Sequence, residues 1–421
     1  MSARHASLLA VALALCAPVA HAQRDTGDLP EMLTMPALLE LVAERSPRLA
    51  VERTAIDAAL ADRVTAGALP NPSISYGRAR PSGGTANTMF TGSRQQQAGI
   101  DLPVLIAGQR SARVDAADQG VLGARARVAQ ATSEMALRAA ELFTGLQAAQ
   151  EKIAVLDEAR GEIEHAVMLI SGRLDSGMAS RYDLARVEME VAGIAVRLAD
   201  ARADAAEKSA GLASLLGAPG WRPRASGELA PKGLQPALPS WQAALASGNP
   251  QIIAARLDED AARAAVRRAE LERWPVPVLS LNRTWTSEPF GAANFIGLST
   301  EVPLFDTRRG QLERAQAELR AAERRRAALE AEAETELARL LDALVQRKSV
   351  QERFERKVDV RSPALRQMAE DAYRLGRSTV LELIDAARTR VDARVTGIDL
   401  RTLTVQQELR ILALTGALSA R

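Results

Sequence analysis

Cysteine, histidine and aromatic residues are scarce in this sequence of 421 residues. It contains one cysteine, three histidines and 3% aromatic side chains. Cys16 and two of the histidines lie within the first 22 residues, which leaves His165 as the one histidine beyond them. A disulfide needs two cysteines, and thiolate or multi-histidine metal sites need several such ligands close together. We therefore expect neither kind of site within a single chain.

Long apolar runs and catalytic motifs are also missing. Beyond residue 22 there is no stretch of about 18 uncharged apolar residues, so we expect no transmembrane helix, and any membrane span would have to consist of strands. The net charge of +2 gives no electrostatic case for nucleic acid as a partner. Without a Walker motif, a nucleophile elbow or a metal-ligand cluster, we predict that the protein is not an enzyme and binds no cofactor.

Residues 1–22 have the pattern of a secretory signal peptide. Arg4 precedes an apolar run over residues 8–19, and Ala20-His21-Ala22 then supplies the small-x-small pattern at which signal peptidase cuts. We expect cleavage there and export of the mature chain. The alternative is lipidation of Cys16, but a lipobox has a small residue before its cysteine, and Leu15 occupies that position.

Ala, Leu, Arg and Glu dominate the rest of the chain, a composition that favours long packed helices. Five pairs of motifs recur in the same order, with an offset that falls from 203 to 199: Ser46-Pro47 with Asn249-Pro250, Pro72 with Pro275, Leu102-Pro103-Val104 with Val302-Pro303-Leu304, Gly177 with Gly376, and Leu216-Gly217 with Thr415-Gly416. Such self-similarity indicates two copies of one unit. We place them at residues 23–216 and 249–416, joined by an irregular proline-rich connector over 217–248 and followed by a tail over 417–421.

Each copy shows the same succession of hydrophobic periods. A helix over 35–67, or 250–272, ends at a proline, and two strands follow, at about 73–78 and 95–102 in the first copy and 276–285 and 295–302 in the second. Heptad-like apolar spacing then predicts a long antiparallel helical hairpin over 108–216 and over 308–416. Its first helix, at 1.5 Å per residue, would extend roughly 95 Å.

Four strands are too few to close a membrane barrel, because the smallest such barrels have about eight, and open edges in lipid leave backbone groups unpaired. Three chains would supply about twelve strands and as many helical lengths, so a trimer is the simplest closed solution. We therefore predict a mainly α fold with a small membrane β-barrel portion. A duplicated helix-strand-strand-long helix-helix unit builds a trimeric α-barrel and a β-barrel of about 12 strands.

Several motifs carry a resemblance to a known family: Ser46-Pro47-Arg48-Leu49, Ala68-Leu69-Pro70-Asn71-Pro72-Ser73-Ile74-Ser75, Asp101-Leu102-Pro103-Val104-Leu105, Gly108-Gln109-Arg110, Glu301-Val302-Pro303-Leu304-Phe305-Asp306, Arg173-Leu174-Asp175-Ser176-Gly177 and Tyr373-Arg374-Leu375-Gly376-Arg377-Ser378-Thr379. On these residues nearly all of the mature chain resembles the TolC-like outer-membrane efflux channel family, the outer membrane factors. The sequences at 69–72 and 108–110 look most like the heavy-metal branch, the CzcC-like proteins.

The resemblance implies a homotrimer in the cell outer membrane, in contact with its lipid and with a large periplasmic portion. Its partners would be a periplasmic adaptor, or membrane fusion protein, and an inner-membrane pump of the RND type. As the exit duct of a tripartite efflux system it would conduct substrate passively, with divalent heavy-metal cations as the favoured cargo. Two alternatives remain open, a periplasmic coiled-coil adaptor or scaffold, and the outer-membrane component of a protein secretion system.

Glu382 and Asp385 stand three residues apart at the start of the last helix, so both carboxylates share one helical face. By resemblance these positions match the acidic periplasmic gate of the family, which attracts cations and constricts the closed entrance. The alternative is an ordinary helix start, where acids favour the helix dipole. The first copy has Asp183 but Arg186 three residues later, so the acidic pair is not duplicated.

The two tip turns, at Gly177 and Gly376, must reverse the chain between long helices, which glycine allows at the least steric cost. The resemblance implies that the adaptor docks on these tips, with Ser180 and Thr379 beside the turns. The alternative for these two residues is simple helix capping.

Two further groups complete the candidate residues. Tyr373, Arg374 and Arg377 could tether neighbouring helices when the gate is shut, or could simply be exposed. Four prolines are expected at the strand-helix junctions, where a fixed φ and a missing N–H direct the chain: Pro72, Pro103, Pro275 and Pro303.

Overall fold

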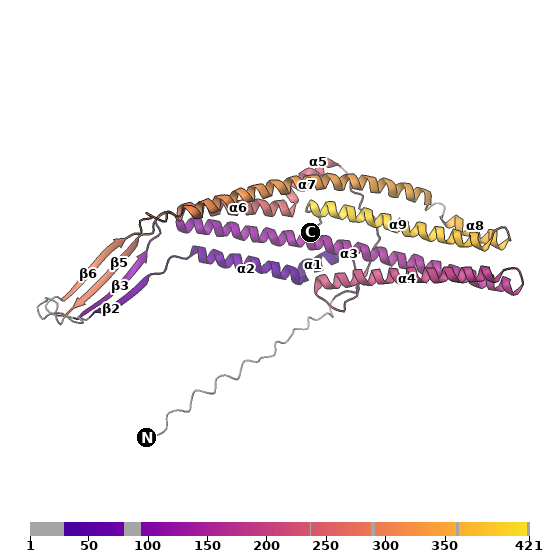
Figure 1. Ribbon diagram of the computed structural model, residues 1–421, viewed down its shortest axis with the longest axis horizontal. Coiled ribbons are helices and arrows are strands. Elements are labelled where there is room, and N and C mark those ends of the chain that lie inside the picture. The colour runs from indigo at the N-terminus through magenta and orange to yellow at the C-terminus, as the bar shows by residue number, and fades with distance from the viewer. Residues whose placement is uncertain (1–28, 80–93, 236, 288–290, 359–361, 419–421) are drawn as a thin grey trace, which may run out of the picture.

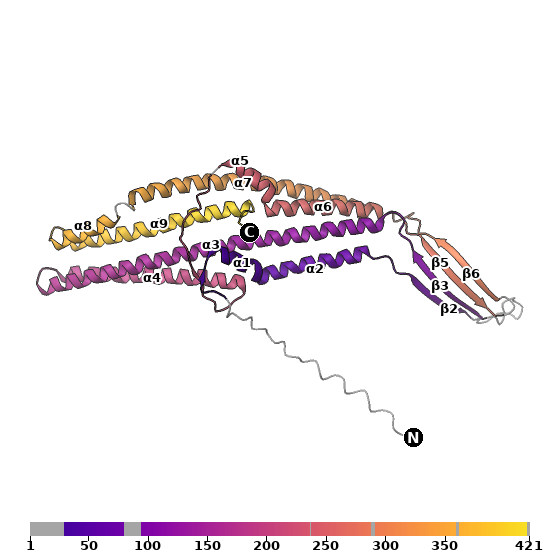
Figure 2. The ribbon, with the colours of Figure 1, turned by 180° about the vertical axis from the view of Figure 1, so that it is seen from behind.

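The protein is a long, narrow molecule with strands at one end and, at the other, the turns of two helical hairpins (Figures 1 and 2). The computed structural model describes residues 29–79, 94–235, 237–287, 291–358 and 362–418. The expected signal peptide and Cys16 lie outside these residues. No helix in the described ranges is both long and apolar enough to cross a bilayer.

The elements follow the predicted duplication. The first repeat contains α1 Met35–Arg45, α2 Pro47–Gly67, β2 Ser73–Ala79, β3 Gln95–Pro103, α3 Gln109–Asp175 and α4 Arg181–Leu216. The second contains α5 Leu238–Gly248, α6 Pro250–Leu271, β5 Val278–Thr286, β6 Gly291–Ser299, α7 Arg309–Val358, α8 Ser362–Arg374 and α9 Val380–Leu414. Two short strands, β1 Met32–Leu33 and β4 Arg224–Ala225, pair in parallel beside the helices.

Two expectations were wrong in detail. The first helix is divided into α1 and α2, because Ser46 takes an extended conformation and Pro47 begins a new helix. The connector is not wholly irregular, since it holds β4 and α5, and α5 precedes α6 as α1 precedes α2. The first arm of the second hairpin contains α7 and α8, and the residues between them, 359–361, lie outside the described ranges.

A four-stranded antiparallel sheet, in the order β2-β3-β5-β6, joins the two repeats through the β3–β5 pair. The strands β2, β3 and β5 lie within two residues of the expected ranges, whereas β6 begins at Gly291 rather than 295. The earlier start of β6 follows from its hairpin register, in which Gly291 pairs with Thr286 at the end of β5. Thr300 to Val302, expected as strand, lie beyond the last rung with β5, which is at Ser299.

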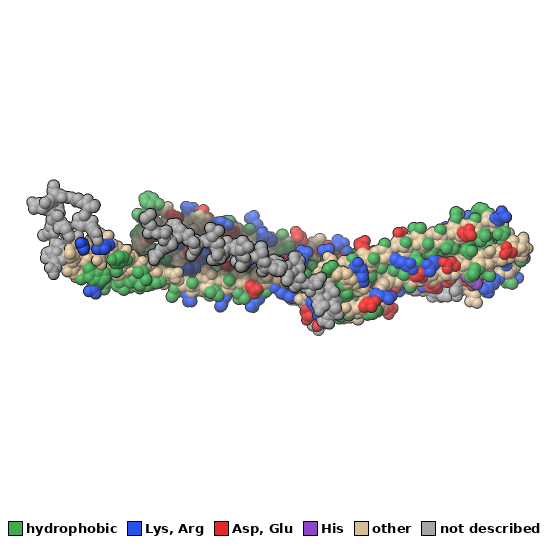
Figure 3. All heavy atoms as spheres, turned by 90° about the horizontal axis from the view of Figure 1, so that it is seen from below, with side chains coloured by type: hydrophobic (Ala, Val, Ile, Leu, Met, Phe, Trp, Pro, Cys, Tyr) green, Lys and Arg blue, Asp and Glu red, His purple; other side chains and the backbone are tan. Residues whose placement is uncertain are grey.

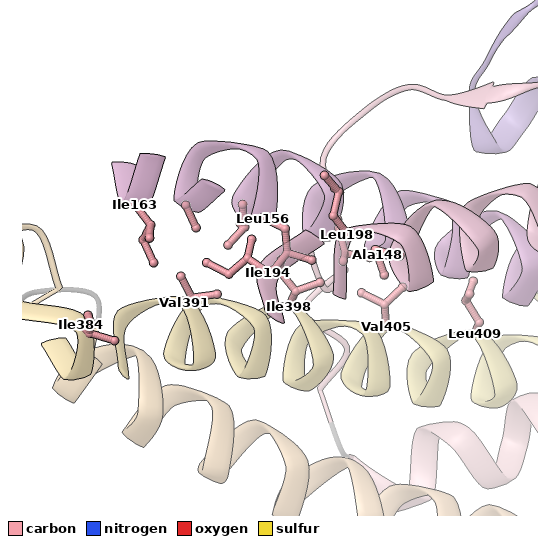
Figure 4. Packing of buried hydrophobic residues seen from close by; sticks show 14 of the residues in the cluster. Ala148, Leu156, Ile163, Ile194, Leu198, Ile384, Val391, Ile398, Val405 and Leu409 are labelled. Carbon is pink, nitrogen blue, oxygen red and sulfur yellow. The ribbon is translucent and has the colours of Figure 1, made fainter. Parts of the chain in front are cut away.

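The hairpins pack as the heptad spacing predicted. Figure 4 shows Leu156 and Ile163 of α3 and Ile194 of α4 pointing toward Val391 and Ile398 of α9. These side chains are at most 4% exposed and belong to one hydrophobic cluster that links both repeats. Burial of each such side chain contributes roughly 1.5–3 kcal/mol relative to exposure. The predicted stripes therefore form the core between the hairpins.

A buried carboxylate fixes the connector against the hairpins. Glu408 of α9 is 1% exposed, accepts a hydrogen bond from the backbone N–H of Leu234 at 3.0 Å, and pairs with Lys348 of α7 at 3.2 Å. Lys348 in turn donates to the carbonyl oxygen of Leu234 at 2.6 Å. The corresponding position in the first repeat, Ser209 of α4, donates to the carbonyl oxygen of Pro223 at 3.3 Å. Equivalent positions thus hold the two ends of the connector.

The surface differs between the two ends of the molecule. In the face shown in Figure 3, hydrophobic side chains gather over the strands, whereas acidic and basic side chains are spread along the helices. The exposed apolar residues of the sheet include Ile74, Tyr76, Phe295, Ile296 and Leu298, which are 60–83% exposed. The sheet therefore presents apolar side chains to its surroundings.

Candidate functional site

The candidate site lies at the end of the molecule opposite the sheet, where the α3–α4 and α8–α9 turns lie (Figure 1). Gly177 and Gly376 have φ values of +73° and +67°, a left-handed conformation that L side chains rarely adopt. Each turn is followed by a capping residue, Ser180 for α4 and Thr379 for α9. The predicted reversals therefore occur at these glycines.

Both turns end in a complete capping box. At the first tip, Ser180 Oγ accepts from the backbone N–H of Asp183 at 3.1 Å, and the Asp183 carboxylate accepts from the N–H of Ser180 at 3.1 Å. At the second tip, Thr379 Oγ1 accepts from the N–H of Glu382 at 3.3 Å, and the Glu382 carboxylate accepts from the N–H of Thr379 at 3.0 Å. Capping was the alternative considered for Ser180 and Thr379, and it is confirmed. Adaptor docking on the same residues stays a prediction.

Glu382 lies on the first turn of α9 and Asp385 on the second, and both side chains are exposed. Glu382 holds the helix start with one carboxylate oxygen, so its charge sits beside the positive end of the helix dipole. The pKa of Arg388, one turn further on, is raised, first by its hydrogen bonds to Glu190 and to a smaller extent by the charges of Asp392 and Asp385. The pair can therefore attract cations at this tip, and its role as a gate stays a prediction.

The predicted tethering residues divide into a buried ring and two exposed cations. Tyr373 is 5% exposed, and the guanidinium of Arg173 lies 4.4 Å from its ring centroid. Arg173 also donates to the carbonyl oxygen of Arg374 at 3.2 Å, so α3 is tied to the end of α8 within one chain. The side chains of Arg374 and Arg377 are exposed. Sequence reasoning missed Arg173 as a site residue, although it lies four residues before Gly177.

A row of ion pairs behind the tips links α9 to α3. Its members on the two helices are Arg390 with Glu162, Arg394 with Glu158 at 2.5 Å, Arg401 with Glu151 at 2.6 Å, Arg410 with Glu141 at 2.8 Å, and Asp399 with Lys152 at 2.6 Å. The paired residue numbers add up to 551 or 552 at every pair, so the two antiparallel helices keep one alignment. We call this row the α3–α9 ion stripe.

Burial varies along the α3–α9 ion stripe. The side chain of Arg390 is 7% exposed, and its pKa is lowered, first by burial and against the opposing charge of Glu158. The other arginines of the stripe are about a third to a half exposed. Two further pairs, Arg388 with Glu190 and Asp392 with Arg197, connect α9 to α4. In the sequence, the one signal of this stripe is the spacing of some of its charges by four and seven residues.

The four junction prolines lie where strands and helices meet. Pro72 and Pro275 precede β2 and β5, Pro103 ends β3, and Pro303 follows β6. At the β3 junction the backbone N–H of Val104 donates to the carbonyl oxygen of Pro277 at 2.8 Å. This bond attaches the first repeat to the second at the root of the sheet.

Within the described ranges, no group of three or more His, Cys, Asp or Glu side chains is arranged to hold a metal ion. His165 is exposed on α3. The acidic and basic residues of the site are therefore paired with each other or face solvent.

The model of the family described as outer membrane efflux protein matches residues 38–218 and again 241–417. The chain is 25% identical to the cobalt-zinc-cadmium resistance protein CzcC of Cupriavidus metallidurans over 72% of this chain and 73% of that protein. It is also 25% identical to the nickel-cobalt-cadmium resistance protein NccC of Alcaligenes xylosoxydans xylosoxydans, over 74% of this chain and 70% of that protein. The fold matches the outer membrane protein VceC of Vibrio cholerae with a TM-score of 0.72 and 18% identity, covering 91% of this chain and 96% of that structure.

Proposed function

This chain belongs to the outer membrane efflux protein family and is an outer-membrane efflux channel, and on that premise we propose that three copies form its working state. Their sheets would close a barrel of about 12 strands in the outer membrane, and their hairpins would continue it as a periplasmic tunnel. One observation carries this proposal. Among the residues that the structure describes, the outer strands β2 and β6 of the four-stranded sheet are each paired along one edge and open along the other.

The trimer is tested by the size of the purified protein in mild detergent. Light scattering coupled to size-exclusion chromatography should give three times the mass of one chain, and the protein should fractionate with outer membranes. A monomer in several mild detergents would contradict the proposal, because one sheet with two open edges cannot stay in lipid.

We further propose that a periplasmic adaptor contacts the two tips and that an inner-membrane pump of the RND type supplies the energy. The tips offer a rigid surface for this, since both turns are fixed by capping boxes and Arg173 joins one tip to the other. The duct would then conduct substrate passively. Co-purification of the adaptor with the wild-type channel, and its loss when Gly177 and Gly376 are both changed to proline, would test this contact.

Divalent heavy-metal cations are the cargo class that we propose. Two relatives, CzcC and NccC, are metal resistance proteins by name, and exposed carboxylates lie at the tip of α9. A deletion strain should become sensitive to cobalt, zinc or cadmium, and a plasmid copy should restore resistance. Sensitivity to hydrophobic drugs with unchanged metal tolerance would contradict this cargo while leaving the channel itself in place.

A further inference from the structure

We infer that the end of β6 and the segment that follows it in one copy pair with β2 of a second copy in one register, with residues 299–303 opposite residues 79–75. This interface rests on the trimer proposed above and specifies which residues meet. The partner is a second copy of this chain, because the open edges of β6 and β2 are the equivalents of the edges of β3 and β5 that pair within one chain. That internal pair is β3 with β5.

The strand pairing of the two hairpins is equivalent residue by residue. Paired residue numbers add up to 174 in the β2–β3 hairpin and to 577 in the β5–β6 hairpin. The two totals differ by 403, which equals the offset of 203 between Pro72 and Pro275 plus the offset of 200 between Pro103 and Pro303. The fall in offset from 203 to 200 lies between the two strands of the hairpin, so the equality means that the two hairpins have the same strand pairing although their lengths differ. The offsets therefore convert a position in one repeat into its equivalent in the other.

Applied to the internal seam, the same offsets give the seam between copies. In β3–β5 the paired numbers add up to 381. Adding 200 to a residue number in β3 gives its equivalent at β6, and subtracting 203 from a number in β5 gives its equivalent at β2. Paired numbers between β6 of one copy and β2 of the next should therefore add up to 378. The resulting pairs are Ser299 with Ala79, Thr300 with Arg78, Glu301 with Gly77, Val302 with Tyr76 and Pro303 with Ser75.

Burial agrees with a missing copy at both edges. Residues 275–280, which the first repeat covers, are half-buried, whereas the equivalent residues 72–77 are all exposed. On the other side of the seam Leu102 and Pro103 are half-buried, whereas Val302 is 67% and Phe305 is 100% exposed. The contrast continues into the helices, where Ala254 of α6 is 4% exposed and its equivalent in α2, Val51, is 67% exposed.

The backbone at the root of the seam fits the same arrangement. In the single chain the N–H of Leu304 donates to the carbonyl oxygen of Val302 at 2.8 Å. In the assembly we expect this N–H to donate instead to the carbonyl oxygen of Ile74 of the second copy, as the N–H of Val104 donates to the carbonyl oxygen of Pro277. Proline is compatible with this seam, because Pro103 already occupies the equivalent rung opposite Val278, beyond the point where β2 pairs with β3. A proline at a strand end loses no ladder bond when its other side is free.

Disulfide crosslinking tests the register directly. The chain has one cysteine, Cys16, within the expected signal peptide, so introduced cysteines would be the reactive thiols of the mature protein. We choose Gly77→Cys with Glu301→Cys, and separately Tyr76→Cys with Val302→Cys, since adjacent antiparallel rungs alternate between closer and wider spacing. Within one chain β2 and β6 are three strands apart, about 14 Å, and cysteines so distant cannot bond.

The matched control is Gly77→Cys with Ser299→Cys, which lies on the same face but two residues out of register. Mild oxidation of the trimer should give covalent trimers at one or both predicted rungs, at least about ten times more than in the control, because diagonal residues lie near 7–8 Å. Trimers that crosslink in the control and not at the predicted rungs would overturn the register while leaving the trimer intact. Crosslinks in neither would overturn it as well. A protein that stays monomeric before oxidation would instead remove the proposed trimer, and the register with it.

Discussion

The two long helical hairpins occupy equivalent places in the two repeats, yet their helices and tip charges differ. The first hairpin rises on α3, a helix of 67 residues, whereas the second rises on α7 and α8, of 50 and 13 residues. Both tips have the same capping box, but only the second places a further acid, Asp385, one turn beyond it, where the first has Arg186. Both repeats therefore keep the same kind of tip turn, whereas the charge one turn beyond the capping box differs between them.

The largest loss of stability is expected from the buried contact of Glu408, which joins the second hairpin to the connector. Glu408→Ala leaves Lys348 without its buried partner and two backbone N–H groups without their acceptor, so we expect a loss of about 3 kcal/mol. Thermal unfolding followed by circular dichroism would measure it. Ser209→Ala, at the equivalent position of the first repeat, is the matched variant and should cost about 1 kcal/mol. Equal losses would mean that the two repeats hold the connector alike.

The next effect concerns the α3–α9 ion stripe. Arg390→Ala removes the most buried arginine of the stripe and leaves Glu162 half-covered, so a loss of about 2 kcal/mol is expected. Arg394→Ala, at a more exposed position, should cost about 0.5 kcal/mol and lose even that at high salt. Urea unfolding at low and high salt separates the two. Identical salt dependence would show that burial does not distinguish them.

A smaller effect is expected from the contact between the two tips. Tyr373→Leu keeps an apolar side chain but removes the ring beneath Arg173, which should cost about 1 kcal/mol. We expect faster amide hydrogen exchange at both tips and little change near the sheet. Tyr182→Leu, an exposed tyrosine beside the first tip, is the control. Faster exchange confined to α8 and α9 would contradict a tie between the repeats.

The smallest effect on folding is expected from the acidic pair, whose consequence should be seen in conduction. Glu382→Gln with Asp385→Asn keeps the shape of the tip and removes its negative charge. Block of single channels by multivalent cations should weaken, because fewer carboxylates attract them. The same amide change at Asp183 in the first repeat should leave block unaltered. If both variants behave alike, the two tips contribute equally and the gate assignment fails.

Local patterns predicted much of this fold because they depend on neighbouring residues. Prolines and tip glycines recur at offsets of 199 to 203 along the sequence, and the strand registers of the two hairpins agree with these offsets. The heptad positions of Ile194 and Val391 were likewise predictable, since a helical period determines which face is buried.

Contacts between distant residues could not be predicted in the same way. Arg173 meets Tyr373 across 200 residues, and Glu408 reaches Leu234 across 174. Such pairs depend on how two helices are aligned in space, and charges on a helix are common enough that no one partner stands out. The helix α5 was missed because the prolines of the connector indicated an irregular segment, whereas Pro239 is the second residue of a short apolar helix, a position that tolerates proline.

The ion stripe has a mechanical consequence. Its five pairs share one alignment, so an axial slip of α9 along α3 by one turn, about 5.4 Å, would separate all of them together. Tilting the helices apart from the tip would instead open them one after another, beginning with Arg390. We therefore expect the ion stripe to resist sliding of α9 along α3 more strongly than separation of the two helices from the tip.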